Sequence, residues 1–174
     1  MSRQFSEFFA QLSEKAPALF PEKTADAALS KEILRSDLFP GKSGESVELC
    51  RAGLLLWNDD LDAAHPISQN VETPTGSFWH AIIHRREADF SNANYWWNRT
   101  GNHPVFEEIC DLALHRVADF AFLDEIRASG RWEPRAFTDF CQKAHKTGEL
   151  QAELEAVQRL EMRALLEWCA SQVK

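Results

Sequence analysis

Apolar residues recur at intervals of three and four along most of the chain, the spacing that places them on one face of an α-helix. The clearest stripes are Phe5, Phe8, Phe9 and Leu12 near the start, and Leu154, Val157, Leu165 and Trp168 near the end. Gly and Pro, seven of each, punctuate the chain between helical segments. No segment alternates apolar and polar residues over a useful length, so the pattern predicts helices and no strands.

Capping residues define where these helices are expected to begin and end. Thr24 and Ser91 are candidate N-caps, and one helix is expected to run from Val47 to a stop at Pro66. Further helices are expected over residues 77–87, and from residue 105 to a C-terminal cap at Gly130. The sequence therefore predicts an all-α fold, a single irregular bundle of about seven helices, with residues 1–174 forming one domain.

The composition narrows the class of protein. Apolar residues make up 44% of the 174 residues and charged residues 26%, which are ordinary values for a folded chain. The net charge of −8 argues against a general nucleic-acid or anionic-membrane binder. No apolar run approaches the roughly 20 residues of a membrane span, and no signal peptide is evident. The four Cys lack metal-finger spacing, so buried thiols in the reducing cytoplasm are expected.

Residues 58–103 differ from the rest of the chain, because they hold four of the six His. From Gly76 to Pro104 the three Arg outnumber the two acidic residues, which reverses the sign of charge locally. On the helix expected from Ser77, Arg86 falls on the same side as Trp79. A buried Arg needs an anionic partner, so the candidates are an anionic ligand or the preceding acidic residues, Asp59, Asp60 and Asp62. The alternative is that the helix ends earlier or that the Arg side chain reaches water.

His80, His84 and Glu87 have i, i+4 and i+7 spacing, so they share another strip of this helix. Two imidazoles one turn apart can hold a metal ion such as zinc, and His65 would be a third nitrogen ligand. Glu87 or Asp62 would then be a ligand, a group that orients a ligand, or a general base. The structural alternative is a buried His that is hydrogen-bonded to a carboxylate.

The segment after this helix suits an anionic or polar ligand. A helix that begins at Ser91 would present free backbone N–H groups and the positive end of its dipole. Arg side chains add forked donors for carboxylate or phosphate. The residues expected to contact such a ligand are Arg85, Arg86, Asn92, Trp96 and Arg99.

A longer pattern covers about a third of the chain. Gly76-Ser77-Phe78-Trp79-His80-Ala81-Ile82-Ile83-His84-Arg85-Arg86-Glu87 is followed by Ser91-Asn92-Ala93, Tyr95-Trp96 and His103-Pro104-Val105-Phe106. The chain thereby resembles an uncharacterised family of small helical proteins that share a GSxWHAIxHRRE…SNAxYW…HPVF block. The resemblance implies membership of that family and assigns no activity, cofactor or role to any residue.

Three functional hypotheses follow. The first is a ligand-binding protein or enzyme with a half-buried pocket for a small polar or anionic molecule, in which His80, His84 and Glu87 orient the ligand or transfer protons. The second is a metal-dependent hydrolase or lyase that uses His65, His80 and His84. The third is a non-catalytic interaction protein in which the His and Arg residues form a structural ion network.

Overall fold

The computed structural model describes residues 2–118 and 120–174, and every regular element within them is an α-helix. The helices are α1 (Arg3–Ser13), α2 (Ala27–Arg35), α3 (Glu45–Trp57), α4 (Leu61–Gln69), α5 (Pro74–Arg86), α6 (Phe90–Thr100), α7 (Phe106–Arg116), α8 (Ala121–Ser129), α9 (Pro134–Thr147) and α10 (Gln151–Ser171). The all-α class is confirmed. The expected number of about seven helices is wrong, since these two ranges contain ten.

The segment expected as one helix up to Pro66 is two helices, α3 and α4. Between them Asp59 has a left-handed backbone conformation, with a φ of 57°. The side chain of Asp60 then caps α4, because it accepts a hydrogen bond from the backbone N–H of Ala63. Pro66 therefore lies inside α4 instead of ending a helix. At this position it removes one intrahelical hydrogen bond from a short helix.

The segment expected to reach Gly130 as one helix is also divided, into α7 and α8. Val117 is extended, with φ of −110° and ψ of 143°, and it ends α7. Gly130 does terminate α8, with the left-handed φ of 68° that the prediction of a C-terminal cap requires.

Three N-caps differ from the expected residues or positions. Asp26 caps α2 in place of Thr24, and Asp89 caps α6 in place of Ser91. Thr73 caps α5, so that this helix begins at Pro74, three residues before the expected start. Each of these side chains accepts hydrogen bonds from backbone N–H groups in the first turn of its helix, which satisfies donors that the helix itself leaves free.

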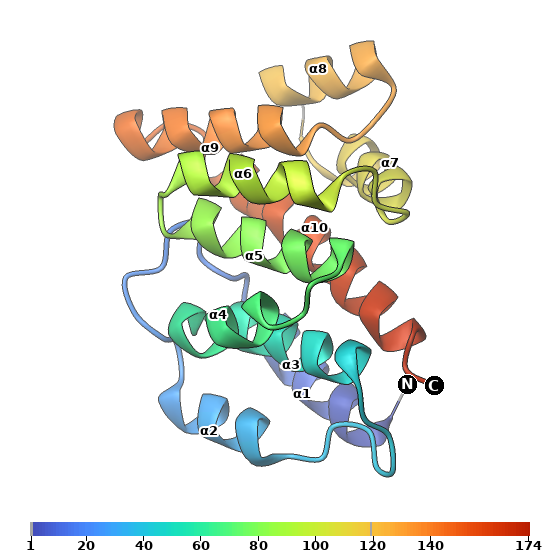
Figure 1. Ribbon diagram of the computed structural model, residues 1–174. Coiled ribbons are helices and arrows are strands. Elements are labelled where there is room, and N and C mark those ends of the chain that lie inside the picture. The colour runs from blue at the N-terminus through green and yellow to red at the C-terminus, as the bar shows by residue number, and fades with distance from the viewer. Residues whose placement is uncertain (1, 119) are drawn as a thin grey trace.

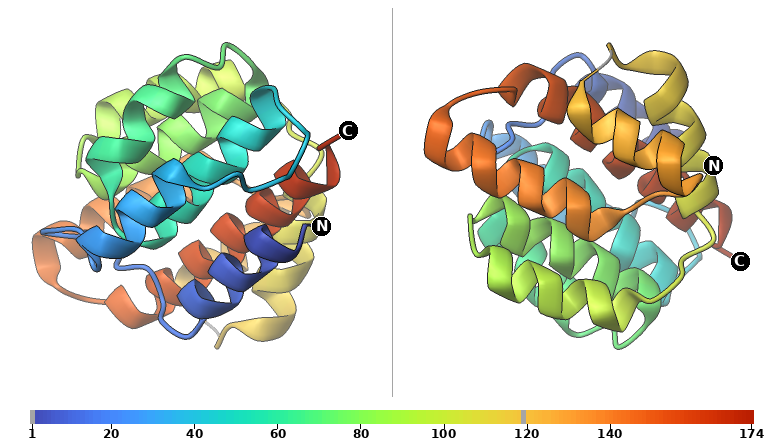
Figure 2. Two further views of the ribbon diagram at one scale, coloured as in Figure 1. Left: turned by 90° about the horizontal axis from the view of Figure 1, so that it is seen from below. Right: turned by 90° about the horizontal axis from the view of Figure 1, so that it is seen from above.

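Helix α5 lies at the centre of the site region. It is flanked by α4 and α6, also contacts α3, and every residue from Thr75 to Arg86 is buried (Figure 1). The long helix α10 crosses the molecule and packs against α3, α7 and α9 (Figure 2). One cluster of buried apolar side chains takes members from all of the described helices. Because α5 is covered on all sides, its polar residues must find partners inside the protein.

The four thiols, at Cys50, Cys110, Cys141 and Cys169, are free and buried. This agrees with the expectation from their spacing. In the ranges 2–118 and 120–174 no helix has both the length and the apolar character that crossing a bilayer demands.

Candidate metal centre

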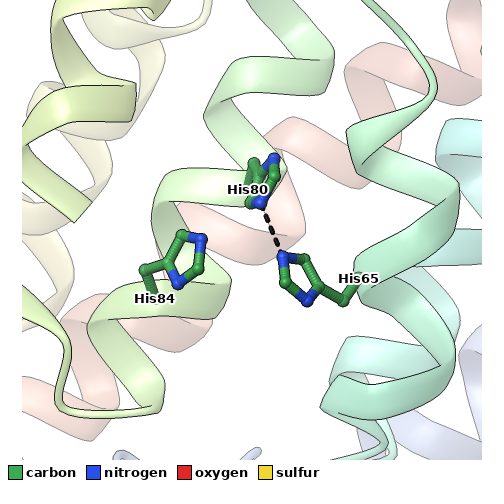
Figure 3. A group of neighbouring side chains, drawn as sticks. All are labelled: His65, His80 and His84. Carbon is green, nitrogen blue, oxygen red and sulfur yellow. Dashed lines mark hydrogen bonds between the residues drawn. The ribbon is translucent and has the colours of Figure 1, made fainter. Parts of the chain in front are cut away.

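Three imidazoles converge between α4 and α5 (Figure 3). His80 and His84 lie one turn apart on α5 and are buried, and the half-buried His65 reaches them from α4. One ring nitrogen from each residue lies within 4.8 Å of the other two. Among residues 2–118 and 120–174 no other group of three or more His, Cys, Asp or Glu side chains has a geometry suited to a metal ion. The three His that the sequence predicted to lie together are therefore adjacent.

The closest pair is His65 and His80, whose Nε2 atoms are 2.7 Å apart. Two neutral imidazoles meet at this distance only when one Nε2–H donates to the lone pair of the other. A metal ion held by both Nε2 atoms would replace that proton, because a metal ligand needs a free lone pair.

His84 is oriented by a carboxylate. Its Nδ1 is 2.9 Å from Oε2 of Glu87, the residue that ends α5. Nδ1–H donates to this carboxylate, so the lone pair of the neutral ring lies on Nε2. This pattern, in which a carboxylate fixes the tautomer of a histidine, accompanies most metal-binding His. Of the three roles that the sequence suggests for Glu87, orientation of His84 is the one this contact supports.

Helix α6 closes the site with Asn92 and Trp96. The side-chain nitrogen of Asn92 is 3.1 Å from Nε2 of His84. The Trp96 ring stacks on His80, with 3.9 Å between centroids and an angle of 20° between the planes. The guanidinium carbon of Arg99 lies 5.4 Å from the Trp96 ring centroid, so the Trp96 ring contacts both an imidazole and a cation. Trp96 and Asn92 therefore adjoin the imidazoles, while Arg99 contacts Trp96, and their expected contact with a ligand stays a prediction.

The environment keeps the central imidazole neutral. Burial, followed by the neighbouring His84 and His65, lowers the pKa of His80 to about 3. A protonated His80 would lie beside two other imidazoles in a site with little water. At neutral pH His80 thus has a lone pair available, which is the state that binds metal.

Arg85 is not available to a ligand. It is fully buried, and both of its terminal nitrogens reach Glu161 of α10, with Nη1 3.2 Å from Oε1. Its Nη2 is also 3.3 Å from Oε1 of Gln158, and its guanidinium lies over the ring of Phe137. Burial acts to lower the pKa of Arg85, but Glu161 opposes this and raises it above its ordinary value. The expected role of Arg85 as an anion donor has no support here, because the side chain is fully buried and both terminal nitrogens bond to α10.

Arg86 is also fully buried, and it pairs with Asp59, one of its three expected acidic partners. Its Nε donates to the backbone oxygen of Ala18 at 3.1 Å, and Nη1 to that of Leu56 at 2.6 Å. Burial lowers the pKa of Arg86 to about 10, although Asp59 favours the charged form. The guanidinium therefore connects α5 to the turn before α4, and its expected role as a ligand-binding residue is likewise unsupported.

A groove of about 420 Å³ is lined by Glu87 and Asp62 and by none of the three imidazoles. Glu87, which orients His84, forms part of its wall, and so does Asp62, which precedes His65 by one helical turn. Lys23 is a basic residue in the lining of the same groove. The groove is thus a polar surface with four acidic side chains, and it meets the imidazole cluster through Glu87, which bonds His84.

His103, the fourth His of this region, lies apart from the cluster. Its Nε2 is 3.1 Å from the Thr75 hydroxyl, and its Nδ1 accepts a hydrogen bond from the backbone N–H of Val105 at 3.3 Å. Burial lowers the pKa of His103 to about 4. A proton on Nδ1 would break the bond from Val105, so the neutral ring is the one that fits.

We expect the metal-free protein to lose stability as the pH falls from 6.5 to about 4. The pKa of His103 is below its unfolded value, so the unfolded chain binds more protons in this interval and acidification favours unfolding. The expected contribution of this residue is about 3 kcal/mol. Urea unfolding at several pH values, with a chelator present, measures it in the wild type and in His103→Gln. An equal pH dependence in both proteins would contradict the assignment.

Comparisons with protein families, with curated proteins and with solved structures show no match to this chain. The interpretation of the site therefore depends on its own geometry.

Sequence reasoning missed Glu161 and Gln158, the partners of Arg85. A signal for both was present, because each lies at helical spacing from the apolar residues Leu154 and Leu165 on the same face of α10.

Proposed function

We propose that this chain binds a divalent transition metal such as zinc through His65, His80 and His84, and that it is a metal-dependent hydrolase or lyase. The observation that carries the proposal is the convergence of three ligand nitrogens within 4.8 Å, in a site where a carboxylate already orients one ring. Three imidazoles with a further position for water or substrate are one of the ligand sets of catalytic zinc sites.

A bound metal of this kind would polarise a carbonyl or supply a hydroxide near neutral pH. The protein's own residues would do the rest. Glu87 holds the tautomer of His84, and Trp96 shields His80 on one side. Buried surroundings keep water away from the rings of His80 and His84, which strengthens electrostatic interactions within the site.

We further propose that the substrate is a small polar molecule and that the protein acts in the cytoplasm. The polar groove beside Glu87 and Asp62 supports the first part. Free, buried thiols support the second, because they suit a reducing compartment. The geometry disfavours an anionic substrate held by Arg85 and Arg86, since these side chains are paired inside the protein.

The hypothesis of a structural ion network is favoured for Arg85 and Arg86 alone. Their pairing with Glu161 and Asp59 needs no ligand. The imidazole cluster is different, because Glu87 is the one acidic side chain bonded to it among the described residues, and no ion pair accounts for the approach of His65 to His80. Metal binding gives a reason for their convergence that packing alone does not supply.

The test is the metal content of purified protein after incubation with zinc and removal of the excess. We expect about one zinc per chain in the wild type, and at least a tenfold lower content in His80→Ala and in His65→Ala. His115→Ala, which removes an exposed His on α7, is the matched control and should retain the metal. Zinc should also raise the melting temperature of the wild type, since binding to the folded state stabilises it.

His65→Ala guards against misfolding, because His65 is only half-buried and its loss leaves the core unchanged. Failure of folded wild-type protein to retain zinc, cobalt or nickel would contradict the proposed function. So would retention of the metal by both His variants.

A further inference from the structure

We propose that Trp96 positions His80 for the metal by stacking on its ring, an inference that rests on the proposed function. The centroids of the two rings are 3.9 Å apart and their planes differ by 20°, so the indole covers a face of the imidazole. His80 is buried and Trp96 is half-buried, which keeps most water away from this contact. An indole offers no lone pair to a metal, so Trp96 would act through His80.

His80 lacks the hydrogen bond that usually orients a metal-binding histidine. Such a residue binds the metal through one ring nitrogen and donates the N–H of the other to a carboxylate, a backbone carbonyl or water. His84 follows this pattern, since its Nδ1–H donates to Glu87. Nδ1 of His80 is buried and has no hydrogen-bond partner among residues 2–118 and 120–174. Another contact must therefore fix the orientation of the His80 ring.

Metal binding would also remove the hydrogen bond that joins the rings of His80 and His65. In the metal-free protein their Nε2 atoms are 2.7 Å apart (Figure 3). Both nitrogens need a free lone pair to bind a metal, so the proton between them must leave. The proton of the His80 ring is then on Nδ1, where no described residue accepts it. Stacking on Trp96 is a contact that both states can keep.

The attraction between the two rings should increase when the metal binds. An indole ring has a negative face, which attracts cations more strongly than the rings of Tyr and Phe do. A divalent metal on Nε2 withdraws electrons from the imidazole and makes the ring of His80 more positive. Because the contact lies in a site with little water, this attraction is weakly screened. Trp96 should therefore raise the affinity for the metal, and not only the stability of the fold.

Trp96 is itself held in place by contacts that need no metal. The N–H of Asp89 donates to the carbonyl oxygen of His84 at 2.9 Å, which ties the start of α6 to the end of α5. The ring of Tyr95 meets the indole edge-on, with 5.4 Å between centroids, and Arg99 lies within cation–π distance of it. The indole is thus placed over the imidazole before a metal arrives.

The experiment is a titration of metal-free protein with Co²⁺, whose visible absorption reports the number and geometry of its ligands. Trp96→Leu should bind Co²⁺ about tenfold more weakly than the wild type and with altered absorption bands, because the ring of His80 is then free to tilt. Trp96→Phe keeps a ring face over the imidazole, so it should recover most of the affinity and the wild-type bands. A loss of packing alone would lower stability and leave the bands unchanged.

Trp168→Leu is the matched control. Trp168 is also half-buried and its ring also contacts a histidine, but this is His103, which lies outside the cluster. The control variant should have the Co²⁺ affinity and the absorption bands of the wild type. Circular dichroism of the metal-free variants checks folding. If Trp96→Leu does not fold, Trp96→Met decides the question, because its longer side chain fills more of the volume and has no ring face.

The outcomes separate this inference from the proposed function. If folded wild-type protein binds no Co²⁺, both are wrong. If His65→Ala loses binding but folded Trp96→Leu or Trp96→Met binds Co²⁺ as tightly as the wild type and with its bands, only the role of Trp96 is wrong. Equal affinities of Trp96→Phe and Trp96→Leu would also contradict this role, since the effect would then not come from a stacked ring.

Discussion

Glu161→Ala is expected to lower the free energy of unfolding by about 4 kcal/mol. Glu161 and Arg85 are both fully buried and joined by a two-pronged ion pair between α10 and α5. Removal of the carboxylate leaves the guanidinium in the core with Gln158 as its remaining hydrogen-bond partner. An uncompensated buried charge is among the most costly defects that a single substitution creates. Urea unfolding followed by circular dichroism measures the loss.

The same helix supplies the control. Arg163 and Glu167 form an ion pair on the exposed side of α10, so Glu167→Ala should cost about 0.5 kcal/mol or less. The double variant Arg85→Met with Glu161→Leu should regain most of the stability, because it removes both charges and keeps apolar volume. A loss below about 1 kcal/mol in the free energy of unfolding of Glu161→Ala would show that the Arg85–Glu161 pair does not stabilise the fold as expected.

Gly76→Ala is expected to cost about 3 kcal/mol of stability. Gly76 lies in the first turn of α5, and a Cβ at this position would overlap the backbone carbonyl of Val71. A flexible side chain can move away from an added methyl group, but this carbonyl belongs to the backbone and α5 would have to shift. Since α5 carries His80 and His84, we also expect weaker zinc binding in this variant. Chemical unfolding and a zinc titration measure the two effects.

Ser77→Ala is the matched comparison, because it changes the next residue of the same turn and adds no atom. It should stay within about 1 kcal/mol of the wild type and bind zinc equally well. Equal stability of Gly76→Ala and Ser77→Ala would mean that the two backbones are not held as closely as the structure shows.

The helical spacing was enough to predict that His80, His84 and Glu87 share one strip of a helix. The reason is that a regular helix fixes the angle between residues four and seven apart. The same reasoning placed Arg86 among apolar residues and named Asp59 as a candidate partner, and the two side chains do pair. The side of a helix on which a residue lies, and the need of a buried charge for a partner, can thus be predicted from the sequence.

The ends of helices were less predictable. The turn at Asp59 and Asp60 separates α3 from α4, although the helical spacing of apolar residues continues across this turn. Asp59 pairs with Arg86 of α5, which is distant in sequence. A pattern within one segment contains no information about such a partner.

By itself the sequence determined the helical class, the strip of α5 that carries the imidazoles and the need of a buried Arg for an anion. All three follow from periodicity and from the cost of burying charge, which are properties of short segments. Only the tertiary structure decided that α4 and α6 cover this strip, that Glu161 takes Arg85 away from any ligand, and that Asn92 lies beside His84. These contacts depend on how helices pack, and packing joins residues whose positions no local pattern relates.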